Sequence, residues 1–221
     1  MKFFTKKRIV LFLLFIFPLI CFLLLSTGIN NASKLPIYGK NAIDISAVDA
    51  TKTLKNKISI ICFLGEDITK NTGGVFNLSQ NIYKKFIKHN DFQIIAIYPK
   101  GNENEVLKFK KELGAFTDMV KWKFTAGSRE DINTLFDSFE TNTTLDNFFS
   151  SDAFLLDKNG YLRARTDDKV EIDRKLIGYN MNSVADLKKI MKDDINALYY
   201  EYYAAFKNKN KNKADRKEIG S

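Results

Sequence analysis

Two nearly continuous apolar segments constrain the fold of this chain more than any other feature. Residues 58–64 (ISIICFL) and residues 92–98 (FQIIAIY) are rich in isoleucine and aromatic side chains. Such segments are typical of strands that are buried on both faces of a sheet. Between them, apolar residues recur at helical spacing and predict an amphipathic helix over residues 76–88, with apolar positions Val75, Leu78, Ile82 and Phe86. A strand, a helix and a second buried strand predict a parallel βαβ unit.

The remaining elements continue in a mixed α/β order. The sequence predicts a helix over 102–114, a strand over 119–124, a helix over 128–139 capped by Ser128, a hairpin of strands 153–157 and 161–166 closed by Asn159–Gly160, and a long helix over 183–206 capped by Ser183. This is the order of the thioredoxin fold with one inserted helix–strand pair. We therefore predict a thioredoxin-like mixed β-sheet with flanking helices. A doubly wound nucleotide-binding fold is the alternative, but no G-x-G-x-x-G motif follows the first buried strand.

The N-terminal residues predict a membrane anchor that precedes this domain. Residues 9–25 (IVLFLLFIFPLICFLLL) are almost wholly apolar, and with the following STGIN they approach the ~20 residues that span a bilayer. The basic residues Lys2, Lys6, Lys7 and Arg8 come before this stretch, and basic flanks stay in the cytoplasm. A cleaved signal peptide is the alternative, although the apolar stretch is long and no clear cleavage site follows. We expect one transmembrane helix in the inner (cytoplasmic) membrane, with the C-terminal domain on the periplasmic side.

These patterns divide the chain into four parts. Residues 1–28 are the basic flank and the transmembrane anchor, 29–50 are a linker in which 42–46 could form a short strand, 51–206 are the thioredoxin-like domain, and 207–221 are a basic, disordered tail. The net charge of +9 lies mostly at the two ends of the chain, and the folded part is nearly neutral. We therefore expect no nucleic-acid partner. The tail is either attracted to anionic lipid or an acidic partner, or is simply a solvated end.

Several stretches of the domain match one family of thioredoxin-fold proteins. They are NIYKKF (81–86), FQIIAIYP (92–99), VKWKFTAGSREDINTL (120–135) and FLLDKNGYLRAR (154–165). Together with the N-terminal apolar segment, these stretches make residues 35–206 resemble the SCO/SenC family. That resemblance implies a membrane-anchored copper protein that helps to assemble cytochrome c oxidase.

The chemistry of that family depends on residues that this chain lacks. The family binds copper through two cysteines of a C-x-x-x-C loop after the first strand and a histidine before the hairpin, since thiolates and imidazole suit a soft copper ion. The matching positions hold Ile68, Thr72 and Phe149, with Ser150 beside the last. The resemblance therefore implies no copper site here, and we predict no catalytic, metal-binding or cofactor-binding residues.

A few other side chains could carry chemistry in principle. Cys62 lies inside the first buried strand, so we expect a small buried hydrophobic residue rather than a reactive thiol. The other cysteine, Cys21, lies in the apolar N-terminal stretch, so the domain has no internal disulfide. His89 follows a predicted helix, where a solvated imidazole is expected. Glu66 and Asp67 form an acidic pair that either binds a hard cation or is solvated.

Aromatic residues gather near the end of the last predicted helix. Tyr199, Tyr200, Tyr202, Tyr203 and Phe206 span most of the helix circumference, so they cannot all face one core. Those that are exposed favour a protein contact or the membrane interface. The alternative is that two faces of the helix pack against a terminal extension.

These observations predict a membrane-anchored, non-catalytic thioredoxin-like protein that acts by protein binding. Its expected partners are membrane lipid, through the N-terminal helix, and a membrane protein. Family resemblance suggests that this partner belongs to the assembly of a respiratory membrane complex. The alternatives are a thiol-based redox or peroxide-handling protein that uses Cys62, and a metal carrier with a rebuilt site that uses Glu66, Asp67 or His89.

Overall fold

The computed structural model describes residues 6–26, 34–49, 51, 53–141, 143–165 and 177–218. The chain divides into two compact units, Met1–Ser33 and Lys34–Ser221. Parts of several predicted segments lie outside the described residues. These parts are Lys2 of the basic flank, residues 29–33 of the linker, Thr166 of the hairpin and residues 219–221 of the tail.

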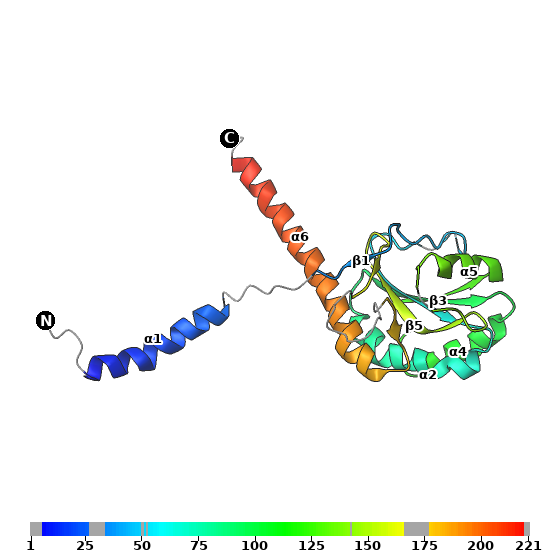
Figure 1. The fold of residues 1–221 in the computed structure, drawn as a ribbon, viewed down its shortest axis with the longest axis horizontal. Helices are drawn as coiled ribbons and strands as arrows, with labels where there is room; N and C mark the ends of the chain where they lie inside the picture. Colours follow the sequence, from blue (N-terminus) through cyan, green and yellow to red (C-terminus); the bar gives the residue numbers. More distant parts are fainter. Residues whose placement is uncertain are drawn as a thin grey trace. The chain divides into compact units, whose positions relative to one another are not determined.

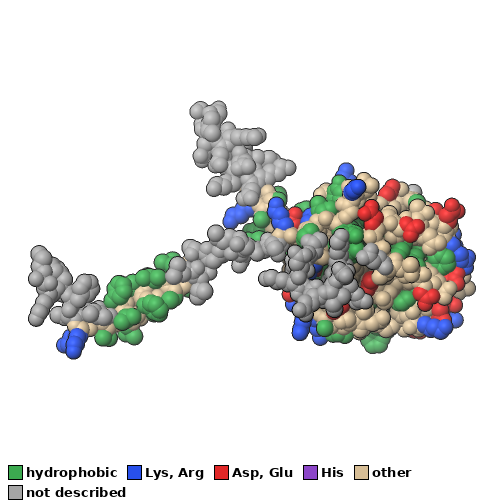
Figure 2. Space-filling model, viewed as in Figure 1, with side chains coloured by type: hydrophobic (Ala, Val, Ile, Leu, Met, Phe, Trp, Pro, Cys, Tyr) green, Lys and Arg blue, Asp and Glu red, His purple; other side chains and the backbone are tan. Residues whose placement is uncertain are grey.

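The first unit contains helix α1 (Lys6–Ser26). Its side chains from Val10 to Leu23 are exposed at nearly every position, and they are apolar, as Figure 2 shows. Among the described residues, no helix combines the length and the apolarity needed to cross a membrane. The structure thus has a helix where the sequence predicted one, but it does not support the prediction that this helix spans a membrane.

The second unit is built on one mixed sheet (Figure 1). Its described strands are β1 (Ile37–Tyr38), β2 (Ile58–Leu64), β3 (Phe92–Pro99), β4 (Trp122–Gly127), β5 (Phe149–Leu156), β6 (Leu162–Arg163) and β7 (Tyr179–Asn180). Their order is β1-β6-β5-β2-β3-β4, and β7 pairs with β5. Strands β2, β3 and β4 run parallel, whereas β5 is antiparallel to β2 and β6 is antiparallel to β5.

Helices cover both faces of this sheet. After β2 come α2 (Ile68–Leu78), the π-helical turn η1 (Ser79–Tyr83) and α3 (Lys84–Phe86); α4 (Glu103–Gly114) follows β3, α5 (Arg129–Asp137) follows β4, and η2 (Asp186–Met191) continues into α6 (Lys192–Glu218). One core contains side chains from α2, α4 and α6, and the other contains side chains from α5. Cys62 belongs to the first core and Phe63 to the second. Strand β2 is therefore buried on both faces, as its continuous apolar sequence predicted.

The connectivity confirms the predicted thioredoxin-like fold. A parallel β2–α2–β3 unit meets an antiparallel β5–β6 pair along the β2–β5 ladder, and α6 follows that pair. Strand β4 with its helix is the predicted insertion. The doubly wound alternative is wrong, because that sheet is mostly parallel, whereas β5 and β6 here run antiparallel to their neighbours.

The first helix of the domain begins earlier than predicted. It starts at Ile68 rather than at residue 76, because Asp67 caps it: the Asp67 carboxylate accepts a hydrogen bond of 3.3 Å from the backbone N–H of Lys70. The predicted cap of α5 is confirmed, since Ser128 Oγ accepts a hydrogen bond of 3.1 Å from the Asp131 N–H. Strand β4 lies three residues beyond its predicted position.

The prediction that residues 29–50 form a linker differs in part from the structure. Its described residues from Lys34 onward belong to the second unit, where Ile43, Ile45 and Val48 are buried in the core. Residues 42–46 form no strand, but the Ile43 N–H donates a hydrogen bond of 2.9 Å to the Gly160 carbonyl. The apolar side chains at alternate positions explain why this stretch is held against the sheet rather than left in solvent.

The structure also differs from the prediction that residues 207–221 form a disordered tail. Helix α6 continues to Glu218, twelve positions beyond the predicted end at residue 206. No proline or glycine interrupts residues 207–218, and lysine, alanine, arginine and glutamate favour helix. The structure thus has a helix over residues 207–218, where the sequence predicted a disordered tail.

Candidate functional site

The candidate site lies at one edge of the sheet, where the three parallel strands end. Strand β2 ends at Leu64, β3 at Pro99 and β4 at Gly127, and a loop or a helix start follows each of them. The carboxyl edge of parallel strands is where α/β proteins place their ligand sites. It is also the edge to which the resemblance assigned the copper ligands of the SCO/SenC family.

The loop after β2 fits tightly against the segment that precedes β5. Gly65 has a φ of +76°, and a Cβ atom on it would lie 2.7 Å from Phe149 Cβ. The N–H of Glu66 donates a hydrogen bond of 3.0 Å to the Asn147 carbonyl. A side chain at position 65 would separate these two segments, so the glycine is what allows their close approach.

The segment before β5 has an unusual backbone conformation. Asn147 and Phe148 have φ values of 47° and 63°, in the left-handed region that a bulky residue such as phenylalanine rarely adopts. Two hydrogen bonds of 2.9 Å between the backbones of Asp146 and Phe149 close this turn. Strain of this kind persists only where the surrounding contacts hold it, and it is concentrated at functional surfaces.

An ion pair joins the ends of β2 and β4, and a separate hydrogen bond adds the end of β3. Glu66 Oε1 accepts hydrogen bonds of 2.9 and 2.6 Å from Nε and Nη2 of Arg129, the first residue of α5. The Arg129 guanidinium lies 5.8 Å from the centre of the Phe148 ring. The Asn102 side-chain amide, after β3, donates to the Glu66 carbonyl. We define Glu66, Asp67, Arg129, Asn147 and Phe148 as the edge surface.

The ion pair remains open to solvent. The side chains of Arg129 and Glu66 are 61% and 38% exposed. An exposed pair contributes at most ~1 kcal/mol to folding. Its location therefore suits contact with another molecule better than stabilisation of the domain.

Asp67 is engaged in local contacts. Besides capping α2, its carboxylate accepts a hydrogen bond of 2.7 Å from the Thr69 hydroxyl and lies 2.9 Å from the Lys70 ammonium. The hydrogen bond from Lys70, followed by that from Thr69, lowers the pKa of the Asp67 carboxyl. The Asn71 amide donates to the carbonyls of Leu64 and Asp67, which ties the loop to the helix.

The three positions that the resemblance matches to copper ligands follow β2 or begin β5. Ile68 is buried at the start of α2, and Thr72 lies one turn further, with its hydroxyl donating 3.2 Å to the Thr69 carbonyl. Phe149 pairs with Leu64 in the β2–β5 ladder. Ser150 is buried and accepts a hydrogen bond from the Asp152 N–H. The side chains at these positions are not the thiolates and imidazole that suit a copper ion.

Cys62 is fully buried in the middle of β2, as predicted. Its neighbours across the two ladders are Ala96 and Ala153, and its thiol lies 3.9 Å from the Ile95 carbonyl. Desolvation by burial raises the pKa of this thiol to about 12. A protonated, inaccessible thiol is a poor nucleophile and a poor metal ligand.

His89 lies far from the acidic pair along the sheet. It comes just before β3, at the amino edge, whereas Glu66 and Asp67 follow β2 at the carboxyl edge. Its exposed ring stacks on Tyr199 with centroids 4.1 Å apart. Within the described part of the chain, no group of three histidine, cysteine or acidic side chains could hold a metal ion. The three residues of the metal-carrier alternative therefore do not form one site.

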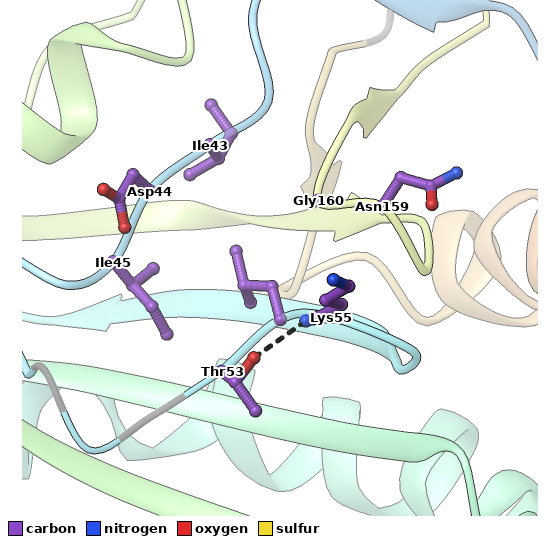
Figure 3. Close-up of a pocket in the computed structure, with 8 residues that line it drawn as sticks. Ile43, Asp44, Ile45, Thr53, Lys55, Asn159 and Gly160 are labelled. Carbon is purple, nitrogen blue, oxygen red and sulfur yellow. Dashed lines mark hydrogen bonds between the residues drawn. The ribbon is translucent and has the colours of Figure 1, made fainter.

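A separate pocket opens at the amino edge (Figure 3). It encloses about 270 Å³ and is lined by Ile43, Asp44, Ile45, Thr53, Leu54, Lys55, Asn159 and Gly160. Its polar atoms serve local turns: Asp44 accepts from Ser46, and Thr53 Oγ1 accepts from the Lys55 N–H. Hydrogen bonds from the Ser46 backbone and side chain lower the pKa of Asp44. These local roles do not assemble a catalytic group.

The sequence prediction missed Asn102, Arg129, Asn147 and Phe148. Asn102 and Arg129 could have been found, because each follows closely after a strand of the parallel group. The predicted end of β4 at residue 124 hid the position of Arg129. Asn147 and Phe148 carry no comparable local signal, since only the pairing of Leu64 with Phe149 brings them to the edge.

Comparison with known proteins places this fold beside Sco and thioredoxin-like structures. ScoI from Arabidopsis thaliana with copper bound is 17% identical, with a TM-score of 0.44 over 65% of this chain and 86% of that one. BsSco, a member of the Sco family of cytochrome c oxidase assembly proteins, is 19% identical, with a TM-score of 0.44 over 66% and 82%. A thiol:disulfide interchange protein of the thioredoxin family from Chlorobium tepidum is 17% identical, with a TM-score of 0.40 over 66% and 82%.

No protein-family model and no curated protein matches the chain. Sco proteins are thus among its structural neighbours, as the sequence motifs predicted. At these identities the likeness is one of fold, and the fold assignment itself rests on the strand order described above.

Proposed function

We propose that this chain is a non-catalytic, thioredoxin-like protein that acts by binding a partner protein through the edge surface. The observation that carries the proposal is the exposed Glu66–Arg129 pair, held beside the Phe148 ring at the edge where thioredoxin-fold enzymes keep their chemistry. Charged and aromatic side chains held by a strained turn form a pre-ordered surface, which lowers the entropy lost on binding.

A thiol enzyme is disfavoured by the state of the two cysteines. Cys62 has no exposed surface and a pKa near 12, so almost none of it is thiolate at neutral pH. Cys21 lies in α1, in the other unit of the chain. A dithiol cycle needs two thiols within bonding reach, and a peroxidatic thiol needs access to solvent.

A metal carrier is disfavoured by the contacts of the candidate ligands. Glu66 is paired with Arg129, and Asp67 is occupied by Thr69, Lys70 and the helix cap. A hard cation would have to displace an arginine and a lysine from these carboxylates. In the part of the chain that the structure describes, no third acidic, histidine or cysteine side chain joins these two as a ligand, whereas calcium takes six to eight oxygen ligands.

We further propose the class of the partner protein and the cellular location of this chain. The SCO/SenC-like motifs support a membrane protein involved in assembling a respiratory complex as the partner. The basic N-terminal flank and the exposed apolar side chains of α1 support attachment to the inner membrane, with the second unit on the periplasmic side. Protease added to spheroplasts should digest the second unit if this orientation holds, and should leave it intact if the unit is cytoplasmic.

Site-specific crosslinking tests the binding surface directly. A photoreactive p-benzoylphenylalanine in place of Phe148 should give a discrete adduct with a membrane protein in native membranes. The same residue in place of Leu107, an exposed position on α4, is the matched control. The Arg129→Glu variant should remove the adduct at position 148. Equal adducts at 107 and 148, or none at 148 in a folded chain, would reject the edge surface as the binding site.

A further inference from the structure

We propose that the C-terminal part of α6 lies on an anionic membrane surface, with three aromatic side chains in contact with lipid. These side chains, here called the aromatic stripe, are Tyr200, Tyr203 and Phe206. They are 46%, 66% and 64% exposed. Tyr200 and Tyr203 are three positions apart, as are Tyr203 and Phe206, so each ring lies next to the following one on the helix surface.

Part of the α6 surface is packed against the domain. Ile195 and Leu198 are fully buried, the Tyr199 ring stacks on His89, and the Tyr202 hydroxyl accepts a hydrogen bond of 3.1 Å from the Lys158 N–H. Tyr200 and Tyr203 lie away from these packed residues. Phe206 follows Tyr202 by four residues on the packed side of the helix, yet it is 64% exposed, so none of the three rings is part of the core.

Two buried or half-buried ion pairs fix the helix to the hairpin. Arg165 contacts Asp194 at 2.7 Å, and Arg163 contacts Glu201 at 3.3 Å. Glu201 lies next to Tyr200 in the sequence and between Tyr200 and Tyr203 along the helix. The start of the aromatic stripe therefore has a defined position on the second unit.

The same arginine links this position to the start of the second unit. Arg163 Nη1 donates a hydrogen bond of 2.5 Å to the carbonyl of Leu35. Leu35 is the second residue of the unit Lys34–Ser221, which follows the unit Met1–Ser33 in the sequence. Arg163 thus brings the beginning of the domain to the part of α6 that bears the stripe. If α1 is held by lipid, this is the end of the domain that is connected to the membrane.

Charge selects an anionic membrane as the occupant. Residues 207–218 contain Lys207, Lys209, Lys211, Lys213, Arg216 and Lys217 against Asp215 and Glu218. A basic segment next to the bilayer is attracted to anionic headgroups, and aromatic rings favour the interfacial layer. An apolar strip followed by a basic segment in one continuous helix is the combination found in interfacial helices. An acidic protein partner would use the charge but would not by itself account for the three exposed aromatic rings.

The experiment uses the full chain in lipid nanodiscs. Phe206→Cys in a Cys21→Ser background carries an environment-sensitive fluorophore, and the buried Cys62 stays unlabelled. Leu107→Cys, another exposed apolar position, is the matched control. Nanodiscs contain phosphatidylcholine alone or with phosphatidylglycerol, each with a nitroxide-bearing lipid that quenches fluorophores in contact with the bilayer.

The expected result is strong quenching and a blue shift at position 206 on anionic discs, little at position 107, and loss of the effect in high salt. Tyr200→Ser with Tyr203→Ser should weaken it. Quenching at 206 no greater than at 107 would overturn the inference, as would equal quenching on neutral and anionic discs. Protection of position 206 without any lipid would show contact between copies instead.

The inference rests on the membrane attachment proposed above, and the two can fail separately. Co-elution of the chain with neutral nanodiscs reports on α1, whereas quenching at 206 on anionic discs reports on α6. Co-elution without quenching at 206 rejects only the inference. A chain that associates with neither kind of disc rejects both.

Discussion

Glu66 and Arg129 lie 63 residues apart in the chain and form a two-contact ion pair at the carboxyl edge of the sheet. Glu66 follows β2 and Arg129 begins α5 after β4, so the pair reaches across the end of β3, where Asn102 also binds the Glu66 backbone. This edge holds an exposed salt bridge beside the Phe148 ring, and it is the surface that we propose for recognition of a partner.

Exchanging the charges of this pair separates recognition from folding. Glu66→Arg with Arg129→Glu keeps an ion pair but reverses its orientation. Because exposed pairs contribute ~1 kcal/mol or less, the free energy of unfolding should change by no more than that. The crosslink from position 148 should be lost, since a partner would meet reversed charges. Retention of the crosslink in the exchanged variant would show that this pair does not contact the partner.

Alkylation kinetics test the burial of Cys62. We expect the thiol to react with iodoacetamide far more slowly in the native protein than after unfolding in guanidinium chloride, because burial removes access and raises its pKa to about 12. Mass spectrometry of the peptide that contains Cys62 distinguishes it from Cys21. Native-state labelling as fast as that of a free thiol would favour the redox alternative.

The same thiol predicts a pH dependence of stability. The unfolded thiol ionises near pH 9, whereas the folded one stays protonated up to about pH 12. Between these values the unfolded state binds fewer protons, so stability should fall as pH rises. Cys62→Ala lacks this contribution and should lose less stability over that window, although it should be ~1 kcal/mol less stable at neutral pH through lost packing. Parallel denaturation curves at several pH values measure the difference.

Two glycines, Gly65 in the loop after β2 and Gly73 in α2, should respond in opposite directions to substitution by alanine. Gly65→Ala should destabilise the domain by ~2 kcal/mol or more, because position 65 has a φ of +76° and its Cβ would meet Phe149. Gly73→Ala, inside α2 with nothing near its Cβ, should stabilise it by up to ~1 kcal/mol. Thermal unfolding of both variants gives the comparison. Destabilisation of similar size at both positions would contradict the described backbone of the loop.

Substitution of the buried Arg163 should destabilise the domain far more than substitution of the exposed Arg129. Arg163 is buried, and Asp157, which has no exposed surface, accepts a hydrogen bond of 2.8 Å from it. Arg163→Ala should destabilise the domain by ~3–5 kcal/mol, because it leaves the Asp157 carboxylate buried without its cation. The exposed Arg129→Ala serves as the control and should change stability by ~1 kcal/mol or less. Chemical denaturation measures both, and similar values for the two would argue against the Arg163 network.

Local patterns in the sequence determined the main elements of the fold. The isoleucine-rich runs predicted β2 and β3, and Asn159–Gly160 marked the hairpin between β5 and β6. Ser128 marked the start of α5, and the burial of Cys62 also followed from its position in an apolar run. Each of these features depends on residues within about ten positions of one another, where the period of a strand or helix and the chemistry of a turn leave a readable signal.

Only the tertiary structure decided how distant segments meet. The pairing of Leu64 with Phe149 brings the Asn147–Phe148 turn to the loop after β2, and the contact of Arg163 with both Leu35 and Glu201 joins the start of the domain to α6. No local pattern announces these contacts, because they depend on strand register and on packing between elements far apart in the chain. The sequence therefore predicted that the copper ligands of the SCO/SenC family are missing from this chain. The structure showed which side chains lie at the carboxyl edge of the sheet.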